Sequence, residues 1–519
     1  NTGVIIRGNQ TGVTDVSVLA TGDFFLQAGT GANSSVSIES TDADAEGVSV
    51  DATNITIANT GAGTDSDAFI NASNGATNAS LLFSGICTGC VAVTNPAATA
   101  GSQFGVWAAN FTASGAVFFD NTSGSFLWDD PLNWNTDLLP DSTKDVTISF
   151  GGTISLASGN HTIGSLTGSD NLNISNGSLA VIGNTTLTGN VAVSGGTATF
   201  GGATSIAGSF SLSGGTAQFD GATTLANVNI SGAGVNPIII LNGLTSITGT
   251  LNMSAATFTP EIQGSGTTSV AGLFTWDGGV VKDNTMTLNG GLDITSAFGS
   301  SLIDGASITL AAGQTGNVSD SVVISNNGSF INQGTLTIND SIGDFSSSDD
   351  TGTFDNQATG TILFGGTSGF VDIGGGTGLN IITSGTIDAG DGTINLDSSN
   401  TVQWNGGRWT AGAGDINVIG ALDIGGTAVK TLDGFTYLTS SGVNITGQGD
   451  LDIINGGDFI VGLAGPVSHT SDADIISSDS TGTFTVNAGG TFSKNNRSTE
   501  ISTTFVNNGN VDISSNGTL

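Results

Sequence analysis

The sequence predicts an all-β chain that folds as a right-handed parallel β-helix, also called a β-solenoid, of about 20 residues per coil. Three observations predict this fold: few helix formers, short runs of alternating apolar residues, and a repeat with a glycine at a fixed place. The chain has 519 residues, of which 82 are Gly and 6 are Pro. Glu occurs only at Glu39, Glu46, Glu261 and Glu500, whereas Thr, Ser, Val, Ile, Asn and Asp dominate. This composition disfavours helices and favours strands joined by tight turns.

The repeat is clearest in Thr186–Val193 and Ser205–Leu212, which share the pattern Thr/Ser, apolar, any, Gly, any, apolar, any, apolar. The two copies are offset by about 19 residues along the chain. Further copies are Ser246–Met253, Ser269–Trp276, Thr287–Ile294 and, more loosely, Asn417–Ile424. Such short strands cannot bury their apolar faces alone, so stacked copies predict one continuous core, with roughly 26 coils over the whole chain. The side chains predicted to point inward are Leu187, Val191, Val193, Ile206, Phe210, Leu212, Ile247, Leu251, Val270, Phe274, Leu288, Leu292 and Ile294.

A second pattern begins near residue 325, where Phe330–Ile338, Phe354–Ile362 and Phe505–Ile513 each carry Asn shortly before Gly or an equivalent turn residue. Asn and Gly tolerate turns, and Asn side chains stacked coil over coil can form hydrogen-bonded ladders. The motifs Trp276-Asp-Gly-Gly and Trp404-Asn-Gly-Gly lie about 128 residues apart. This interval indicates an ancestral block of several coils that was copied.

Three regions follow from these patterns. Residues 1–123 are predicted to form an Ala/Asp-rich β-solenoid segment, and residues 124–149 form a junction rich in Trp and Pro. Residues 150–519 are predicted to be a regular β-solenoid. Within it, residues 276–403 and 404–519 form an approximate internal duplication with a period of about 129 residues.

The junction carries a resemblance. It contains Trp128, then Pro131-x-Asn133-Trp134, then Pro140, then Asp145-Val-x-Ile148, and coils of the Leu-x-x-Gly type follow. This arrangement resembles large repetitive bacterial surface proteins with autotransporter-passenger or filamentous-haemagglutinin-like β-helices. The likeness covers residues 126–519, and it implies a β-helix and a location at the cell surface.

The charge balance excludes several classes of partner. Seven Lys and Arg stand against 43 Asp and Glu, which gives a formal net charge of −36. Seven basic residues cannot neutralise a run of phosphates. Nucleic acids and anionic membrane surfaces are therefore not expected partners. No apolar stretch approaches the roughly 18 residues of a membrane helix, so no membrane insertion is expected in this segment. The chain begins without Met and stops within a strand-like pattern, which suggests a piece of a longer polypeptide.

Two acidic segments near the start of the chain are candidate calcium sites. Asp42, Asp44 and Glu46 alternate along one segment, and Asp65 and Asp67 along another. Carboxylates in this arrangement are ligands that Ca²⁺ prefers, although a solvated acidic face that keeps a long rod soluble is the competing interpretation. No cofactor is required, and calcium is the one that is possible. Weaker candidates of the same kind are Asp349 with Asp350 and Asp472 with Asp474.

The chain has two cysteines, Cys87 and Cys90. A small structural disulfide in a turn is favoured over a metal site or a redox centre, because no second pair and no βαβ pattern accompanies them.

An enzyme is the main alternative to a structural role, because β-helices also host polysaccharide lyases and hydrolases. The available bases are scattered: Arg7, Lys144, Lys282, Arg408, Lys430, Lys494 and Arg497, with His161 and His469. Neither a catalytic triad nor a His-based metal site is expected from them, so the prediction is that the chain is not an enzyme. Trp404, Arg408 and Trp409 could contact a sugar, but the favoured interpretation is that Trp404 fills the coil as Trp276 does.

The sequence therefore favours a non-enzymatic, extracellular β-solenoid that acts as a structural or adhesive fibre at the cell surface. A rod of similar coils offers long surfaces for many weak contacts, either with other copies of itself or with surface glycans and proteins. Two alternatives stay open: a subunit that polymerises end to end or side by side into an extracellular filament or surface layer, and a carbohydrate-active β-helix enzyme.

Overall fold

The computed structural model describes residues 117–519 except 233–234, 296–300, 340–343, 367–368 and 515, and it also places the backbone of ten strands before residue 117. The chain forms a parallel β-solenoid of about 16 turns with about 22 residues per coil, which confirms the predicted fold class. Two compact units are present, Asn1–Gly208 and Ser209–Leu519. The one helix in the described part is a 3-10 turn, η1 (Pro131–Asn133). No helix there is long and apolar enough to cross a membrane.

Ten strands in the first unit precede the regular coils, and they pair with one another in parallel. They form one sheet in the order β1-β4-β6-β9-β8 and a second in the order β10-β7-β5-β2, with β3 also on β5. Their bounds are β1 (Val4–Gly8), β2 (Val16–Leu19), β3 (Asp23–Ala28), β4 (Val36–Ser40), β5 (Val48–Asn59), β6 (Ala68–Asn71), β7 (Ser80–Thr88), β8 (Ala92–Val93), β9 (Phe104–Trp107) and β10 (Asn110–Ala113).

The regular coils of the first unit have three sides, with one strand on each. From β12 to β17, each strand pairs in parallel with the strand three places further along the chain, which is the signature of a solenoid. The strands are β11 (Val117–Phe118), β12 (Asp145–Ile148), β13 (Thr153–Leu156), β14 (Asn160–Ile163), β15 (Ser165–Gly168), β16 (Asn171–Ile174), β17 (Ser178–Val181), β18 (Thr185–Leu187), β19 (Val191–Val193) and β20 (Thr197–Phe200). The division between the units falls within β21 (Thr204–Leu212).

The second unit also has three sides, and β23 (Thr223–Ser231) runs along both the first and the second side. The other strands of its first side are β25 (Thr245–Ile247), β28 (Thr267–Val270), β31 (Thr285–Leu288), β34 (Ser307–Leu310), β37 (Ser329–Asn332), β40 (Thr353–Asn356), β43 (Asn380–Thr383), β46 (Val402–Trp404), β49 (Leu422–Ile424), β52 (Val443–Ile445), β55 (Val467–His469), β58 (Thr491–Lys494) and β62 (Asn510–Ile513).

The second and third sides are built in the same way. The second side has β26 (Leu251–Ser254), β29 (Phe274–Asp277), β32 (Leu292–Ile294), β35 (Thr315–Val318), β38 (Thr335–Ile338), β41 (Thr361–Phe364), β44 (Thr386–Asp388), β47 (Gly407–Thr410), β50 (Lys430–Asp433), β53 (Leu451–Ile454), β56 (Ile475–Ile476) and β60 (Ile501–Ser502). The third side has β22 (Thr216–Phe219), β24 (Ile238–Leu241), β27 (Glu261–Gln263), β30 (Gly279–Lys282), β33 (Ser301–Asp304), β36 (Val322–Ser325), β39 (Phe345–Ser347), β42 (Phe370–Thr377), β45 (Thr393–Ser398), β48 (Asp415–Ile419), β51 (Thr436–Leu438), β54 (Asp458–Val461), β57 (Thr483–Val486) and β61 (Thr504–Asn507). A short pair, β59 (Arg497–Ser498) with β63 (Gly517–Thr518), lies beside the last coils.

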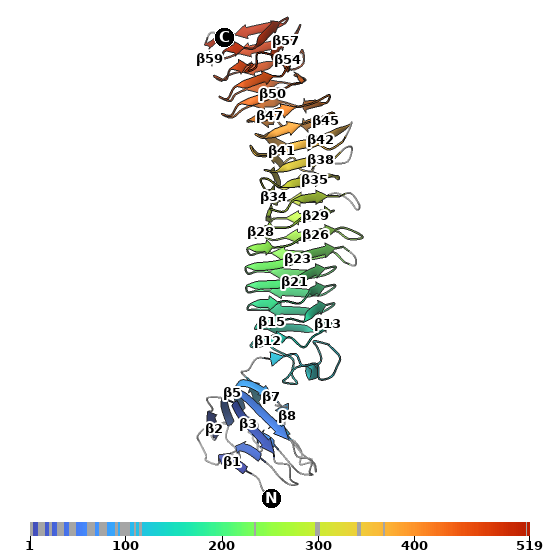
Figure 1. Ribbon diagram of the computed structural model, residues 1–519, viewed down its shortest axis with the longest axis vertical. Helices are drawn as coiled ribbons and strands as arrows, with labels where there is room; N and C mark the ends of the chain where they lie inside the picture. The colour runs from blue at the N-terminus through green and yellow to red at the C-terminus, as the bar shows by residue number, and fades with distance from the viewer. Residues whose placement is uncertain are drawn as a thin grey trace. The chain divides into compact units, whose positions relative to one another are not determined.

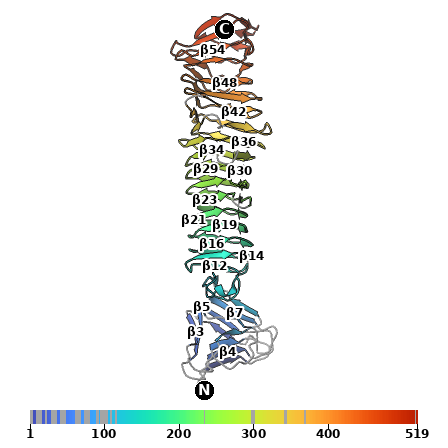
Figure 2. The same ribbon diagram turned by 90° about the vertical axis from the view of Figure 1, so that its right-hand side faces the viewer.

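Successive coils of the second unit lie one above the next, as Figure 1 shows from green to red. Seen after a quarter turn, the third-side strands β30, β36, β42 and β48 follow one another along the stack (Figure 2). Each strand pairs in parallel with the next strand of its own side, for example β25 with β28 and β28 with β31. A residue therefore lies directly above its counterpart in the previous coil.

The core lies inside the coils. All thirteen side chains predicted to point inward are at most 2% exposed, which confirms the predicted register. They stack in columns, such as Leu251, Phe274 and Leu292 on the second side. One long column occupies the last position of the first-side strands, and we call it the interior column. Its members are Ile247, Val270, Leu288, Leu310, Asn332, Asn356, Thr383, Trp404, Ile424, Ile445, His469 and Lys494. Ile513 takes the next place in register, but it is 45% exposed.

Steric contact with the previous coil explains why glycine occupies the fixed place in the repeat. A Cβ on Gly272 would lie 2.4 Å from the carbonyl oxygen of Gly249 in the previous coil, and one on Gly290 would lie 2.2 Å from the oxygen of Ala271. The turn between the first and second sides thus packs backbone on backbone, so only glycine fits at this place.

The coils are longer than the sequence pattern predicts, and fewer of them are formed. The extra length lies in some connections between the second and third sides. The chain runs from Ser254 to Glu261 between β26 and β27, whereas Gly278 alone separates β29 from β30. Right-handedness stays a prediction.

Candidate functional sites

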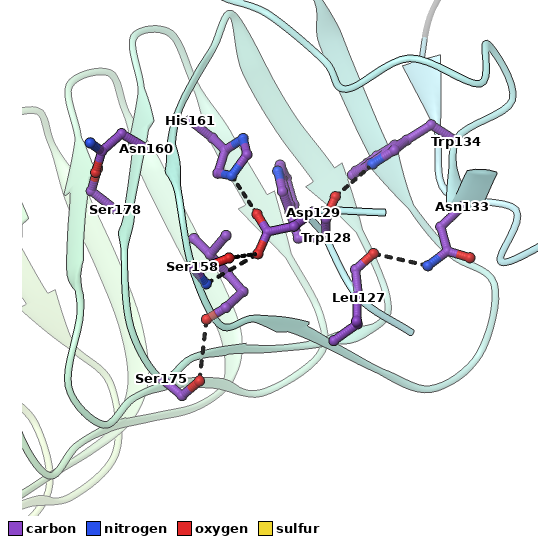
Figure 3. A network of polar contacts seen from close by, with 11 residues as sticks. Leu127, Trp128, Asp129, Asn133, Trp134, Ser158, Asn160, His161, Ser175 and Ser178 are labelled. Atoms are coloured by element: carbon purple, nitrogen blue, oxygen red, sulfur yellow. Dashed lines mark hydrogen bonds and ion pairs between the residues drawn. The ribbon is translucent and has the colours of Figure 1, made fainter. Parts of the chain in front are cut away.

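The Trp/Pro junction forms an irregular coil next to β12, β13 and β14. Val117 of β11 pairs with Val146, and Leu127 bridges to Ser155. Trp128 and Trp134 are fully buried, with ring centroids 4.8 Å apart at 73°, and Trp134 Nε1 donates to the Trp128 carbonyl oxygen at 2.9 Å (Figure 3). The indoles therefore fill the interior of this coil.

A carboxylate beside these indoles collects hydrogen bonds from the next coil. Asp129 Oδ1 lies 2.6 Å from His161 Nε2, and Asp129 Oδ2 accepts from Ser158 N at 3.1 Å and Ser158 Oγ at 2.9 Å (Figure 3). The three residue types are those of a hydrolytic triad, but the hydroxyl donates to the carboxylate and not to the imidazole. The serine is therefore not activated, and the arrangement fixes the junction to β14.

A second carboxylate in the junction is held in the same way. The hydroxyls of Ser123 and Ser125 donate to Asp130 Oδ2 at 2.6 and 2.9 Å. These hydrogen bonds lower the pKa of Asp130. The buried Asn133 donates from Nδ2 to Ser125 Oγ at 2.8 Å and to the Leu127 carbonyl oxygen at 2.9 Å.

The predicted calcium residues Asp42, Asp44, Glu46, Asp65 and Asp67 lie outside the described residues. The predicted disulfide pair lies there too: for Cys87 only the backbone is placed, within β7, and Cys90 is not described. The calcium sites and the disulfide therefore stay predictions.

Turns at the ends of β33, β36 and β39 form what we call the first turn stack: Asp304, Asn326, Asp349 and Thr351. Asn326 donates from Nδ2 to Asp304 Oδ1 and from its backbone N to Asp349 Oδ2 at 2.7 Å. Thr351 donates to Asp349 Oδ1 from its backbone N at 3.1 Å and from Oγ1 at 2.8 Å. The N–H of Asn326, followed by the Thr351 hydroxyl, lowers the pKa of Asp349. Each carboxylate thus links one coil to the next.

The same network recurs about 130 residues further along the chain as the second turn stack: Asp433, Asn455, Asp479 and Thr481. Asn455 donates from Nδ2 to Asp433 Oδ1 at 2.6 Å and from N to Asp479 Oδ2 at 2.7 Å. Thr481 donates to Asp479 Oδ1 from N at 2.9 Å and from Oγ1 at 2.8 Å. These N–H groups lower the pKa of Asp479 to about 2.

The two stacks lie on different sides of the coil. The first follows third-side strands, whereas the second follows the second-side strands β50, β53 and β56. Trp276 and Trp404 show the same displacement, because Trp276 lies in β29 on the second side and Trp404 ends β46 on the first. The two networks and the two tryptophans are therefore each displaced by one side of three, and the duplication itself stays a prediction.

The weaker calcium candidates are engaged by the protein itself. Asp350 Oδ1 accepts from Gly378 N at 2.7 Å, and Asp474 Oδ1 accepts from Glu500 N at 2.7 Å. Asp472 forms an ion pair with Arg497 at 2.7 Å. Among the described residues, no group of three or more His, Cys, Asp or Glu could hold a metal ion.

The proposed sugar contact at Trp404, Arg408 and Trp409 needs correction. Trp404 is 1% exposed and Trp409 is 0% exposed, and their rings stack on each other with centroids 4.1 Å apart at 12°. Only Arg408 points outward, and it forms an ion pair with Asp433. Alternation places both tryptophans at inward positions, so Trp404 fills the coil as Trp276 does, and neither ring offers a face to a sugar.

Three bases that the sequence left scattered are buried in the last coils. Lys430 Nζ donates to the Gly449 carbonyl oxygen at 3.1 Å and to that of Gly426 at 3.4 Å, and burial lowers its pKa to about 8. His469 Nδ1 lies 3.4 Å from Lys494 Nζ, and both side chains are 0% exposed. The sequence did carry a signal, because Val467-Ser-His469 and Phe492-Ser-Lys494 match at an offset of about one coil.

Hydroxyl side chains form two adjacent rows on the outer face of the first side in the second unit, and we call them the hydroxyl array. The first row is Thr224, Ser246, Ser269, Thr287 and Thr309, and the second is Thr267, Thr285, Ser307, Ser329 and Thr353. Within the described part, only Ser269, Ser307 and Ser329 of the array take part in a side-chain hydrogen bond. The remaining hydroxyls are open to a ligand or to water.

Amide side chains behave differently, because they donate hydrogen bonds to one another. The predicted Asn ladder is confirmed in the interior column, where Asn332 Nδ2 donates to Asn356 Oδ1 at 2.9 Å. On the outer face of the second side, Asn339 Nδ2 donates to Asn317 Oδ1 at 2.6 Å. These ladders tie successive coils together and leave fewer groups for a ligand.

Comparisons of the chain with protein-family models, with curated proteins and with solved structures found no match.

Proposed function

We propose that this chain is a non-enzymatic, extracellular β-solenoid fibre with a structural and adhesive role at the cell surface. The hydroxyl array carries the proposal. It is an ordered outer surface whose hydroxyls are mostly without partners in the described part, while the neighbouring amides bond to one another. The resemblance to repetitive bacterial surface proteins with β-helices supports the location.

The structural role rests on coil-to-coil contacts. Parallel pairing, the interior columns, the amide ladders and the two turn stacks each join one coil to the next. In a solenoid of this kind each coil gains stability from its neighbours, so a rod can be long without a larger core.

The adhesive role rests on many weak contacts. Each hydroxyl can donate and accept, so a row of them matches a surface that is rich in hydroxyl and carbonyl groups. The array carries no charge although the chain has a net charge of −36, so a neutral glycan or protein surface meets no repulsion there. Single contacts of this type contribute about 1 kcal/mol or less, and repetition along the rod supplies the avidity.

The test is adhesion of the full chain, displayed on beads, to surfaces coated with neutral polysaccharides and with proteins. A triple variant of the array, Thr285→Val, Thr287→Val and Thr309→Val, should reduce bead retention at least about tenfold. The matched control, Thr275→Val with Thr337→Val on the outer face of the second side, should retain it. Equal retention by both variants would refute the array as the adhesive surface.

Two further readouts separate the alternatives. Electron microscopy of the native chain should show single rods, and filaments that lengthen with concentration would favour the polymerising subunit instead. Release of new reducing ends from a polysaccharide, if it is lost in a matched inactive variant, would refute the non-enzymatic proposal.

A further inference from the structure

The last coils contain an unusual pair of basic side chains inside the solenoid. His469 and Lys494 end β55 and β58, occupy adjacent places in the interior column, and are both 0% exposed. Lys494 Nζ donates to the Ser471 carbonyl oxygen at 2.5 Å and lies 3.4 Å from His469 Nδ1. The imidazole is also packed edge-on against the Phe492 ring, with centroids 6.2 Å apart at 79°.

The neighbours of the two ring nitrogens define the protonation state of His469. Nε2 lies 2.9 Å from the Ala473 carbonyl oxygen, which can only accept, so Nε2 carries the hydrogen. Nδ1 faces Lys494 Nζ and the backbone N–H of Ser471, each at 3.4 Å, and both are donors. A proton on Nδ1 would have no acceptor and would point at an ammonium group. The site therefore holds a neutral imidazole.

Other charged groups near the pair are engaged elsewhere. Asp472 forms an ion pair with Arg497 at 2.7 Å, and Asp474 accepts the Glu500 N–H at 2.7 Å. Thr499, which is 3% exposed, closes the site with its hydroxyl 3.1 Å from His469 Nε2 and 3.0 Å from the Ala473 oxygen. Burial first, and then the charge of Lys494, lowers the pKa of His469 to about 4 despite Asp474 and Asp472.

We propose that His469 and Lys494 form an acid-sensitive lock: residues 467–513 are closed around the neutral imidazole at neutral pH and open reversibly when His469 takes up a proton. The lock joins adjacent coils, because His469 and its turn belong to one coil and Lys494 and Thr499 to the next. Loss of the lock therefore loosens both coils together, and the interior surfaces of both become exposed.

The sign of the effect follows from linkage. The open segment binds the proton with an ordinary histidine pKa of 6.5, whereas the closed segment binds it only near pH 4. The lock is therefore fully effective above about pH 6.5 and weakens progressively down to about pH 4. At about pH 5, opening should be favoured roughly 30-fold relative to neutral pH.

Hydrogen exchange of the full chain at about pH 7.5 and about pH 5, corrected for intrinsic rates, tests the lock. Peptides from residues 467–513 should lose protection roughly 30-fold at the lower pH, while peptides from residues 245–310, which contain no histidine, should not. The variant His469→Gln keeps a donor for Ala473 and an acceptor for Lys494 but cannot titrate, so its response should be flat. Wild-type protection in 467–513 that does not change with pH would overturn the proposal, as would an unchanged response in His469→Gln.

Two more variants keep the test decisive. His161→Gln removes the other histidine of the chain and should leave the response of residues 467–513 intact. If His469→Gln leaves residues 467–513 unprotected at neutral pH, its pH response cannot be read, and the variant Lys494→Met then tests the lock. It removes the charge that faces Nδ1, so the pKa of His469 should move toward 6.5 and the acid response should shrink. A response of unchanged size in Lys494→Met would refute the lock.

Discussion

Two stretches of the interior column share one geometry and differ in chemistry. Ile247, Val270, Leu288 and Leu310 occupy it in the early coils of the second unit and are at most 1% exposed. In the last coils the same position holds His469 and Lys494, which are equally buried. Backbone register, and not side-chain polarity, therefore decides which residues lie inside these coils.

The difference also divides the sources of stability. The early coils are stabilised by apolar burial, which changes little with pH. The last coils bury Lys430, His469 and Lys494 with backbone carbonyls as their main partners. Their stability must therefore depend on pH.

A charge in the early column should have the largest effect. Leu288→Asp places an unpaired carboxylate at a site that is 0% exposed, so local unfolding should become easier by about 4 kcal/mol or more. Thr287→Asp, one residue away on the outer face, should change it by about 0.5 kcal/mol or less. Hydrogen exchange across residues 245–310 measures both. Similar effects at the two positions would contradict the predicted alternation.

The buried amide ladder should come next. Asn332→Leu leaves Asn356 Oδ1 and the Thr361 carbonyl oxygen without the Asn332 donor, at a cost of about 2 kcal/mol. Adding Asn356→Leu should cost less than the sum of the single changes, because the two amides act as a pair. A double-mutant cycle followed by hydrogen exchange gives the coupling, and strict additivity would show that the ladder contributes no pairwise energy.

Removal of a buried charge should stabilise the last coils. Lys430→Met should raise their stability by about 1 kcal/mol at pH 7, because the buried ammonium loses hydration that two carbonyls only partly replace. The pKa of Lys430 falls from 10.5 in the open chain to about 8 in the closed chain, so wild-type stability recovers as the pH rises from 8 to 10.5. The higher stability of Lys430→Met relative to the wild-type chain should therefore vanish near pH 10.5. The half-exposed Lys282 pairs with Asp304 in an earlier coil, so the control Lys282→Met should not raise the stability of the last coils.

The turn stacks should respond at still lower pH. The pKa of Asp479 lies near 2 and that of Asp349 below its usual value, so their contribution is present above pH 3.8 and is lost as the pH falls through these lowered values. The turn at 455–457 is held by Asp479 and Thr481, which belong to residues 467–513, so its protection should fall together with that segment. Protection of the turn at 326–328, which Asp349 holds, should decline only after the response of residues 467–513 is complete. Loss of protection at 326–328 at about pH 5 would contradict separate causes.

Much of the fold could be predicted from the sequence because its main signals are local. Alternation placed Phe210, Leu251 and Phe274 inside, and the glycine spacing predicted a coil only slightly shorter than the observed one. The residues that lengthen the observed coil lie in connections such as Ser254–Glu261, which show no repeating pattern.

The candidate sites were harder to predict because they depend on which face a polar residue occupies. Alternation alone could have placed Trp404 and Trp409 inside on either side of Arg408, yet their residue types suggested a sugar contact. His469 and Lys494 fall at inward positions, but inward positions are expected to be apolar, so their meeting at 3.4 Å was missed. The hydroxyl array needed the register of several coils before its rows could be recognised.

Nuclear magnetic resonance of the histidine rings tests most directly whether the interior column is continuous into the last coils. The chain has two histidines, so ring-labelled protein gives two sets of ring signals, and the signals that remain in His161→Gln belong to His469. We expect His469 to titrate with a pKa of about 4, and Lys494→Met to move this pKa toward 6.5. A His469 pKa near 6.5 in the wild-type chain, unchanged by Lys494→Met, would contradict a buried imidazole facing Lys494.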